Sequence, residues 1–165
     1  MMPLNQKQYD WSMQMLPAVS AILQDNASIF LRFFAAPAED DRNNATDMQL
    51  RAEVSGSDIA VRLRKASCKH RDLTIRSYSG GRKTELHKLR EGKSKWYVYG
   101  WENVDGSIDS YMIIDLDTLR GSGLLENRPE IRNKDDNTAF IVVPVQELFD
   151  RGCLRAYRNL PVSVF

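Results

Sequence analysis

The chain has 165 residues, a net charge of +1, and 42% hydrophobic and 27% charged residues, which are ordinary proportions for a globular protein. This length suits one domain with its own core, and excludes the class of small proteins that need disulfides or a metal to fold. No apolar run reaches the roughly 18 to 20 residues that cross a bilayer, and the first residues lack a secretory pattern. We therefore expect a soluble intracellular protein, with Cys68 and Cys153 as two buried small residues.

The N-terminal half predicts a helix followed by strands. Apolar residues recur at spacings of three and four over residues 11–23, and Pro17 either bends this helix or begins a second one. Residues 28–36 are rich in aromatic and branched side chains, which is typical of a strand. Residues 46–54 and 58–65 are two strand-like runs joined by Ser-Gly-Ser, and they predict a β-hairpin.

The second of these runs alternates between apolar and basic residues. One face carries Ile59, Val61 and Leu63, and the other carries Arg62 and Arg64. We expect the apolar face to be half-buried on the core and the arginines to point toward a ligand.

The C-terminal half predicts a short helix among further strands. Thr84 is a candidate N-cap for that helix, and Gly92 is its expected end. The expected segments are an extended piece at 71–79, the helix within 83–92, an aromatic strand at 95–102, a strand running into a turn or helix at 108–119, and a strand that gives way to a helix at about Val145 within 140–152.

This order of elements predicts the fold class. Strands outnumber helices, and the chain ends on a β-α unit. We expect an α/β or α+β protein with a mixed β-sheet flanked by helices. It forms a single domain over 1–165, with the core at about 10–120 and a C-terminal extension at about 121–165.

The basic residues are concentrated in one region. Residues 60–95 contain twelve Lys or Arg and three acidic residues, whereas the rest of the chain contains 11 basic and 19 acidic residues. This concentration is typical of proteins with a phosphate-rich partner, and the alternative is a solvated lysine-rich surface. Because several of these residues lie on strand-like segments, we favour the first interpretation. The residues assigned to a nucleic-acid-binding face are Arg62, Arg64, Arg76, Lys83 and Lys88.

The order helix, three strands, helix, strand resembles the core of the PD-(D/E)XK nuclease superfamily, and archaeal-type Holliday-junction resolvases in particular. In those proteins an aspartate opens the second strand and Glu-x-Lys lies on the third. Here Asp47 occupies the position of that aspartate, whereas Ala60 and Arg62 replace the glutamate and the lysine. The chain also resembles small proteins of bacterial viruses and prophages over roughly residues 10–120, through its TD, AVR-x-R, TIR and KTEL-x-K segments. That resemblance implies the cytoplasm of a bacterial host cell.

The departure from the nuclease motif bears on hydrolysis. Mg²⁺-dependent cleavage needs several carboxylate oxygens, but Ala60 supplies none and Arg62 cannot lose its proton at accessible pH. The resemblance allows a migrated catalytic site of Asp47, Glu85 and Lys88, in which Asp47 and Glu85 would hold Mg²⁺. Glu39, Asp40 and Asp41, in the loop just before Asp47, are the other residues that could complete a metal site. The alternative is that Glu85 and Lys88 are a surface pair on a helix and that Asp47 caps a turn.

Three other groups of residues leave alternatives open. The aromatic run 96–101 forms either a base-stacking platform or, at least in half, core. Asp115 and Asp117 either bind a cation or cap a helix or loop, and we favour capping. His70 and His87 lie among basic residues, and we expect them at the surface or at a phosphate.

We therefore expect a protein with a restriction-endonuclease-like fold that binds DNA or a related nucleic acid, and that cleaves it with Mg²⁺ if acidic residues have migrated into the site. The alternative is an inactive viral or prophage protein that inhibits or redirects a host nucleic-acid enzyme. Binding to nucleic acid would weaken steeply with salt, whereas a protein interface would weaken less. The tail 160–165 is either the interface strand of a homodimer or the last core strand.

Overall fold

The chain forms two compact units, Met1–Gly56 and Ser57–Phe165. The computed structural model describes residues 4–35, 48–52, 58–134 and 136–163. The predicted site residue Asp47 lies outside the described residues. Within the described ranges, no helix is both long and apolar enough to cross a membrane.

The N-terminal unit consists of helices followed by a two-stranded sheet. Its elements are α1 (Leu4–Gln14), α2 (Leu16–Asp25), a 3-10 turn η1 (Ala27–Phe30), β1 (Leu31–Ala35) and β2 (Met48–Ala52). The two strands pair antiparallel. A proline lies in the first turn of α2, so of the two expectations for Pro17 the start of a second helix is confirmed.

The C-terminal unit contains a mixed four-stranded sheet, as predicted for the fold class. Its strands are β3 (Asp58–Arg64), β5 (Ser94–Glu102), β6 (Ile108–Asp115) and β9 (Leu154–Arg158), in the order β3-β5-β6-β9. β3 runs parallel to β5, and the other two pairs are antiparallel.

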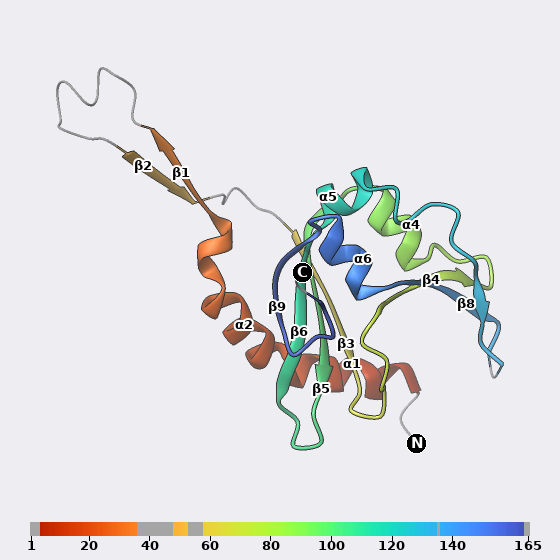
Figure 1. Cartoon of the computed structure of the whole chain (residues 1–165). Helices are drawn as coiled ribbons and strands as arrows, with labels where there is room; N and C mark the ends of the chain where they lie inside the picture. Colours follow the sequence, from red (N-terminus) through yellow and green to blue (C-terminus); the bar gives the residue numbers. More distant parts are fainter. Residues whose placement is uncertain (1–3, 36–47, 53–57, 135, 164–165) are drawn as a thin grey trace. The chain divides into compact units, whose positions relative to one another are not determined.

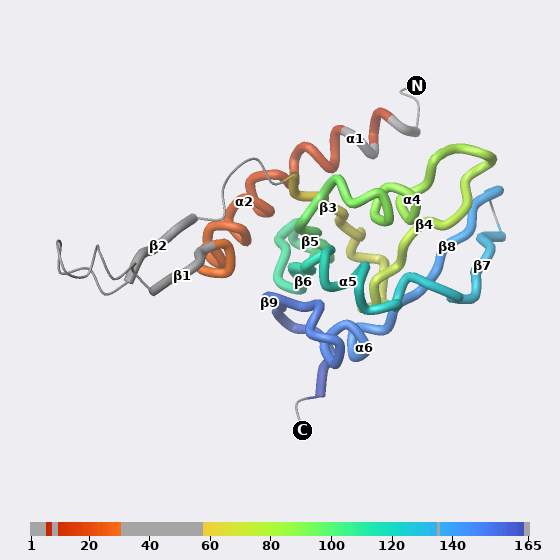
Figure 2. Tube along the Cα trace, turned by 90° about the horizontal axis from the view of Figure 1, so that it is seen from above, coloured from red at the N-terminus to blue at the C-terminus, as the bar shows by residue number. Residues whose placement is uncertain are grey.

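A second, antiparallel sheet has the order β4-β8-β7, formed by β4 (Leu73–Ser79), β8 (Thr138–Val143) and β7 (Ile131–Arg132). In both views β4 and β8 extend side by side away from the four-stranded sheet (Figures 1 and 2).

Three short helices complete this unit, namely α4 (Glu85–Arg90), α5 (Leu116–Gly121) and α6 (Val145–Asp150). One hydrophobic cluster joins these helices to one face of each sheet. From the sheets it contains Leu73 and Ile75 of β4, Tyr97, Tyr99 and Trp101 of β5, Met112 and Ile114 of β6, and Ile141 and Val143 of β8.

The predicted hairpin between residues 46–54 and 58–65 is wrong. β2 pairs with β1, whereas β3 lies parallel to β5 across a crossover that contains β4 and α4. The reason is tertiary: β5 is buried along most of its length and needs a hydrogen-bonding neighbour on each side. The short Ser-Gly-Ser connection permits a hairpin between β2 and β3 but does not require these two strands to pair.

The predicted orientation of β3 is also wrong. Ile59 and Val61 are 38% and 40% exposed, whereas Ala60 packs against the core cluster. Ala60 and Arg62 lie beside Tyr97 and Tyr99 in the register, so the basic face of β3 continues the inner face of the sheet. The arginines are tolerated there because β3 is the edge strand, where polar partners are within reach.

The described part of the tail, residues 160–163, does not form the last core strand. Residues 160–163 are not in a strand, and the sheet ends on β9, which the sequence did not predict. Leu160 and Val162 instead pack against the core cluster from outside any sheet.

Candidate nucleic-acid interface

A groove lies between the basic face of β3 and the outward face of β4. It consists of two adjoining hollows of about 400 and 540 Å³, and both are lined by Arg62 and Arg76. We call it the basic groove, after the six cationic side chains that line it, which are Arg62, Arg64, Arg76, Arg82, Lys83 and Lys88.

Local structure explains why these cations converge. Arg62 and Arg64 are two residues apart on a strand and therefore share a face. On β4 the same period buries Leu73 and Ile75 and turns Arg76 toward the groove. After β4, two glycines with positive φ reverse the chain, and α4 brings Lys88 back to the groove.

Glu85 is the acidic centre of the second hollow. Its carboxylate accepts hydrogen bonds from Arg62 Nη1, from the Tyr97 hydroxyl and, at 3.1 Å, from the backbone N–H of Arg76. Burial lowers the pKa of Arg62, and burial raises the pKa of Tyr97, so that phenol keeps the proton it donates. Glu85 therefore ties β3, β4 and β5 together at the start of α4.

Arg64 bridges the two walls of the first hollow. Its Nε donates to the Tyr99 hydroxyl at 2.5 Å, and its Nη2 lies 3.5 Å from the carbonyl oxygen of Thr74. The Tyr99 hydroxyl also lies 2.8 Å from Thr74 Oγ1. These contacts hold the guanidinium of Arg64 in place before any ligand binds.

The side chains of three cations of the basic groove make no hydrogen bond or ion pair with the described residues, although the charge of Arg76 helps to lower the pKa of Asp136. These three are Arg76, Arg82 and Lys88, and their side chains are exposed. Lys83, by contrast, pairs with Glu91. Of the two carboxylates lining the groove, Glu85 is engaged as described above, and Asp72 accepts the backbone N–H of Val145 at 3.0 Å.

The structure brings most of the predicted site residues together. Arg62, Arg76, Lys83, Glu85 and Lys88 line one hollow, and Arg64 lines the adjoining one. The position of Glu85 at the N-terminus of a helix was expected, but its pairing with Arg62 was not.

Glu85 is engaged by protein donors, and Asp47, the other predicted Mg²⁺ ligand, lies outside the described residues, so the magnesium site stays a prediction. Both oxygens of Glu85 already accept hydrogen bonds, one of them from a guanidinium that supplies the balancing positive charge. Among the residues that the structure describes, no three His, Cys, Asp or Glu side chains are grouped in a way that could hold a metal. Arg62 is thus the cation that Glu85 binds.

The aromatic run 96–101 is not a base-stacking platform. Its four aromatic side chains are at most 3% exposed and belong to the buried body of the sheet. Consecutive residues of the nine-residue strand β5 are buried, and since successive side chains point to opposite faces, both of its faces are covered.

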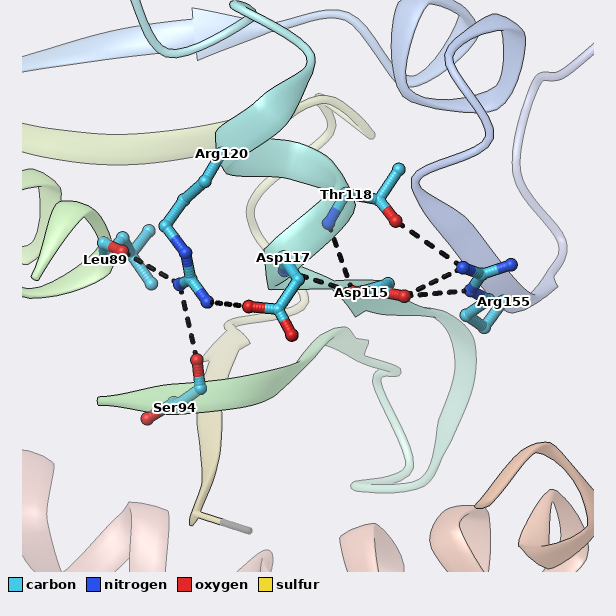
Figure 3. Close-up of polar contacts among 7 residues, drawn as sticks. All are labelled: Leu89, Ser94, Asp115, Asp117, Thr118, Arg120 and Arg155. Carbon is cyan, nitrogen blue, oxygen red and sulfur yellow. Dashed lines mark hydrogen bonds and ion pairs between the residues drawn. The ribbon is translucent and has the colours of Figure 1, made fainter. Parts of the chain in front are cut away.

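Asp115 caps α5, as favoured from the sequence. Its Oδ1 accepts the backbone N–H groups of Asp117 and Thr118 at 3.0 and 3.2 Å, and its Oδ2 accepts Arg155 Nη2 at 2.8 Å (Figure 3). Arg120 Nη1 extends the network to the carbonyl oxygens of Leu89 and Ser94. The network joins α5 to α4, β5 and β9 and has a structural role.

Sequence reasoning missed part of the groove. It did not identify Arg82, nor Phe140, Val142 and Ile131, which form an apolar wall of the first hollow. Alternation within β8 is the signal that could have found Phe140 and Val142, because the residues that alternate with them, Ile141 and Val143, are buried. No signal in the sequence marks Ile131, which lies on a two-residue strand.

Comparison of the chain with protein-family models, curated proteins and solved structures gave no match. The relation to PD-(D/E)XK nucleases therefore stays a prediction. What the protein binds has to be inferred from the basic groove.

Proposed function

We propose that this protein binds nucleic acid through the basic groove. The observation that carries the proposal is the convergence of six cations in one concave surface, and the side chains of three of them make no hydrogen bond or ion pair with the described residues. A polyanion that contacts such cations releases its condensed counterions, and this release supplies most of the affinity of proteins for nucleic acid backbones.

Preorganisation distinguishes this groove from a solvated lysine-rich surface. Arg62 and Arg64 are partly buried, and both are held by hydrogen bonds across the groove. Ordering flexible side chains costs free energy on binding. Here Arg62 and Arg64 are already ordered in the folded protein, so binding does not have to order them. Because three donors engage Glu85, we assign this residue to holding the walls of the groove in place.

Salt-dependent binding tests the proposal. We would measure fluorescence anisotropy of labelled single-stranded and duplex DNA over a salt series, for the wild type and for Arg76→Ala/Lys88→Ala. We expect the double variant to bind about tenfold or more weakly, and the slope of log K against log salt to fall by about two.

The matched control is Arg151→Ala/Arg158→Ala, which removes the same charge from exposed positions outside the groove. Equal weakening in both double variants would mean that net charge, not the groove, attracts nucleic acid. Absence of binding at low salt would overturn the proposal and leave a protein partner, such as a host enzyme, as the remaining hypothesis.

A further inference from the structure

The first hollow of the basic groove has two chemically different walls. Arg62 and Arg64 of β3 form the basic wall, and the outward face of the three-stranded sheet forms the other. On that face, register places Arg76 beside Phe140 and Phe140 beside Ile131, so one row across three strands carries a cation, an aromatic ring and an aliphatic side chain.

The apolar wall is accessible. Ile131 is 47% exposed, and Phe140 and Val142 are partly exposed, whereas Ile141 and Val143 on the opposite face of β8 are buried in the core. Thr74 and Asn133 add a hydroxyl and an amide at its margin. An apolar wall inside a cationic groove favours a ligand that has both a flat apolar face and a negative charge.

We propose that this hollow takes an unpaired nucleobase of the bound strand, with the adjacent phosphates on Arg62, Arg64 and Arg76; the inference rests on the proposed function. An unpaired base has a free face that stacks on aromatic or aliphatic side chains and polar edges that reach hydroxyl and amide groups. In a duplex the faces of the bases are stacked on one another and cannot reach Phe140. The protein therefore prefers single-stranded over duplex nucleic acid.

The size of the hollow agrees with this occupant. Its volume of about 400 Å³ lies within the range of pockets that hold small organic ligands. The hollow adjoins the second one at Arg62 and Arg76, so the strand beside the inserted base would meet the remaining cations there.

The experiment compares three labelled DNA probes of equal length by anisotropy: a mixed-sequence single strand, an abasic single strand and a duplex. The abasic strand has the same backbone charge but no bases. We expect the base-carrying strand to bind about tenfold more tightly than the abasic strand, because each base that stacks on the protein adds favourable binding free energy.

Two variants locate the contact. Ile131→Ala shortens an exposed side chain, and Phe140→Leu removes the ring while keeping most of the apolar volume. Each should weaken binding of the base-carrying strand several-fold and leave the abasic strand unchanged. Val104→Ala is the control, because Val104 is 99% exposed and lies outside the groove.

The outcomes separate the inference from the proposed function. Equal binding of base-carrying and abasic strands would overturn the base pocket but keep the basic groove as a backbone-binding site. No binding of either strand would overturn both. Complete displacement of the strand by micromolar deoxyadenosine monophosphate would overturn the strand as occupant and indicate a free nucleotide.

Discussion

Glu85 is the residue on which the groove depends most. Its removal would leave the Arg62 guanidinium partly buried without its carboxylate, and would free the Tyr97 hydroxyl and the Arg76 N–H. Because uncompensated buried donors cost free energy, we expect Glu85→Ala to lower the free energy of unfolding by about 3 kcal/mol in urea titrations.

Glu91→Ala is the matched control for Glu85→Ala, because it removes another acidic residue near the groove. Glu91 forms an ion pair with Lys83 at the surface, so Glu91→Ala should change the free energy of unfolding far less. If Glu85→Ala were as stable as the wild type, Glu85 would not have the structural role assigned to it.

Among the elements, α5 depends on a charged cap. Burial alone would raise the pKa of Asp115, but hydrogen bonds from Arg155 and from the Thr118 N–H outweigh it and lower the pKa below its usual value of 3.8. A carboxylate with a lowered pKa stabilises the fold above its unfolded pKa, and that stabilisation is lost as the pH falls through the folded pKa.

The variant Asp115→Asn tests this cap, because asparagine also caps helices but carries no charge. Between about pH 5 and pH 2.5 we expect the wild type to lose more stability than the variant, as measured by urea unfolding at each pH. The other carboxylates are common to both proteins, so parallel pH profiles would contradict the assignment.

Most elements of the C-terminal unit were predictable, whereas their pairing was not. The segments around β4, α4, β5, β6, β8 and α6 follow local periodicity and turn residues, and all are confirmed within a few residues. Alternation in β3 identified the strand but assigned its buried face to the wrong side. Periodicity shows that two faces differ, but it cannot show that Tyr97, Tyr99 and Glu85 make the basic face of β3 the inner one.

The candidate site was predictable as a set of residues but not as an arrangement. The regional excess of Lys and Arg led to Arg62, Arg64, Arg76, Lys83 and Lys88, and all five line the basic groove. The pairing of Arg62 with Glu85 joins residues 23 positions apart and requires the crossover, which no local pattern encodes.

For the whole molecule, the division into two units leads to a prediction. The core cluster lies entirely within the C-terminal unit, as does every residue that lines the groove. We expect a fragment of residues 57–165 to unfold in one cooperative transition and to bind single-stranded DNA within a few-fold of the full chain. A fragment without a thermal transition by circular dichroism would show that the first unit is required for folding.

The topology also fixes when the groove can exist during synthesis. Its walls need β3 beside β5, and β4 beside β8, in a register that extends from Leu73 to Val143. A ribosome must therefore complete the chain through β8 before the arginines of residues 62–76 face an apolar wall. Until then the basic segment has no apolar wall opposite it, and the proposed selectivity for bases cannot operate in the nascent chain.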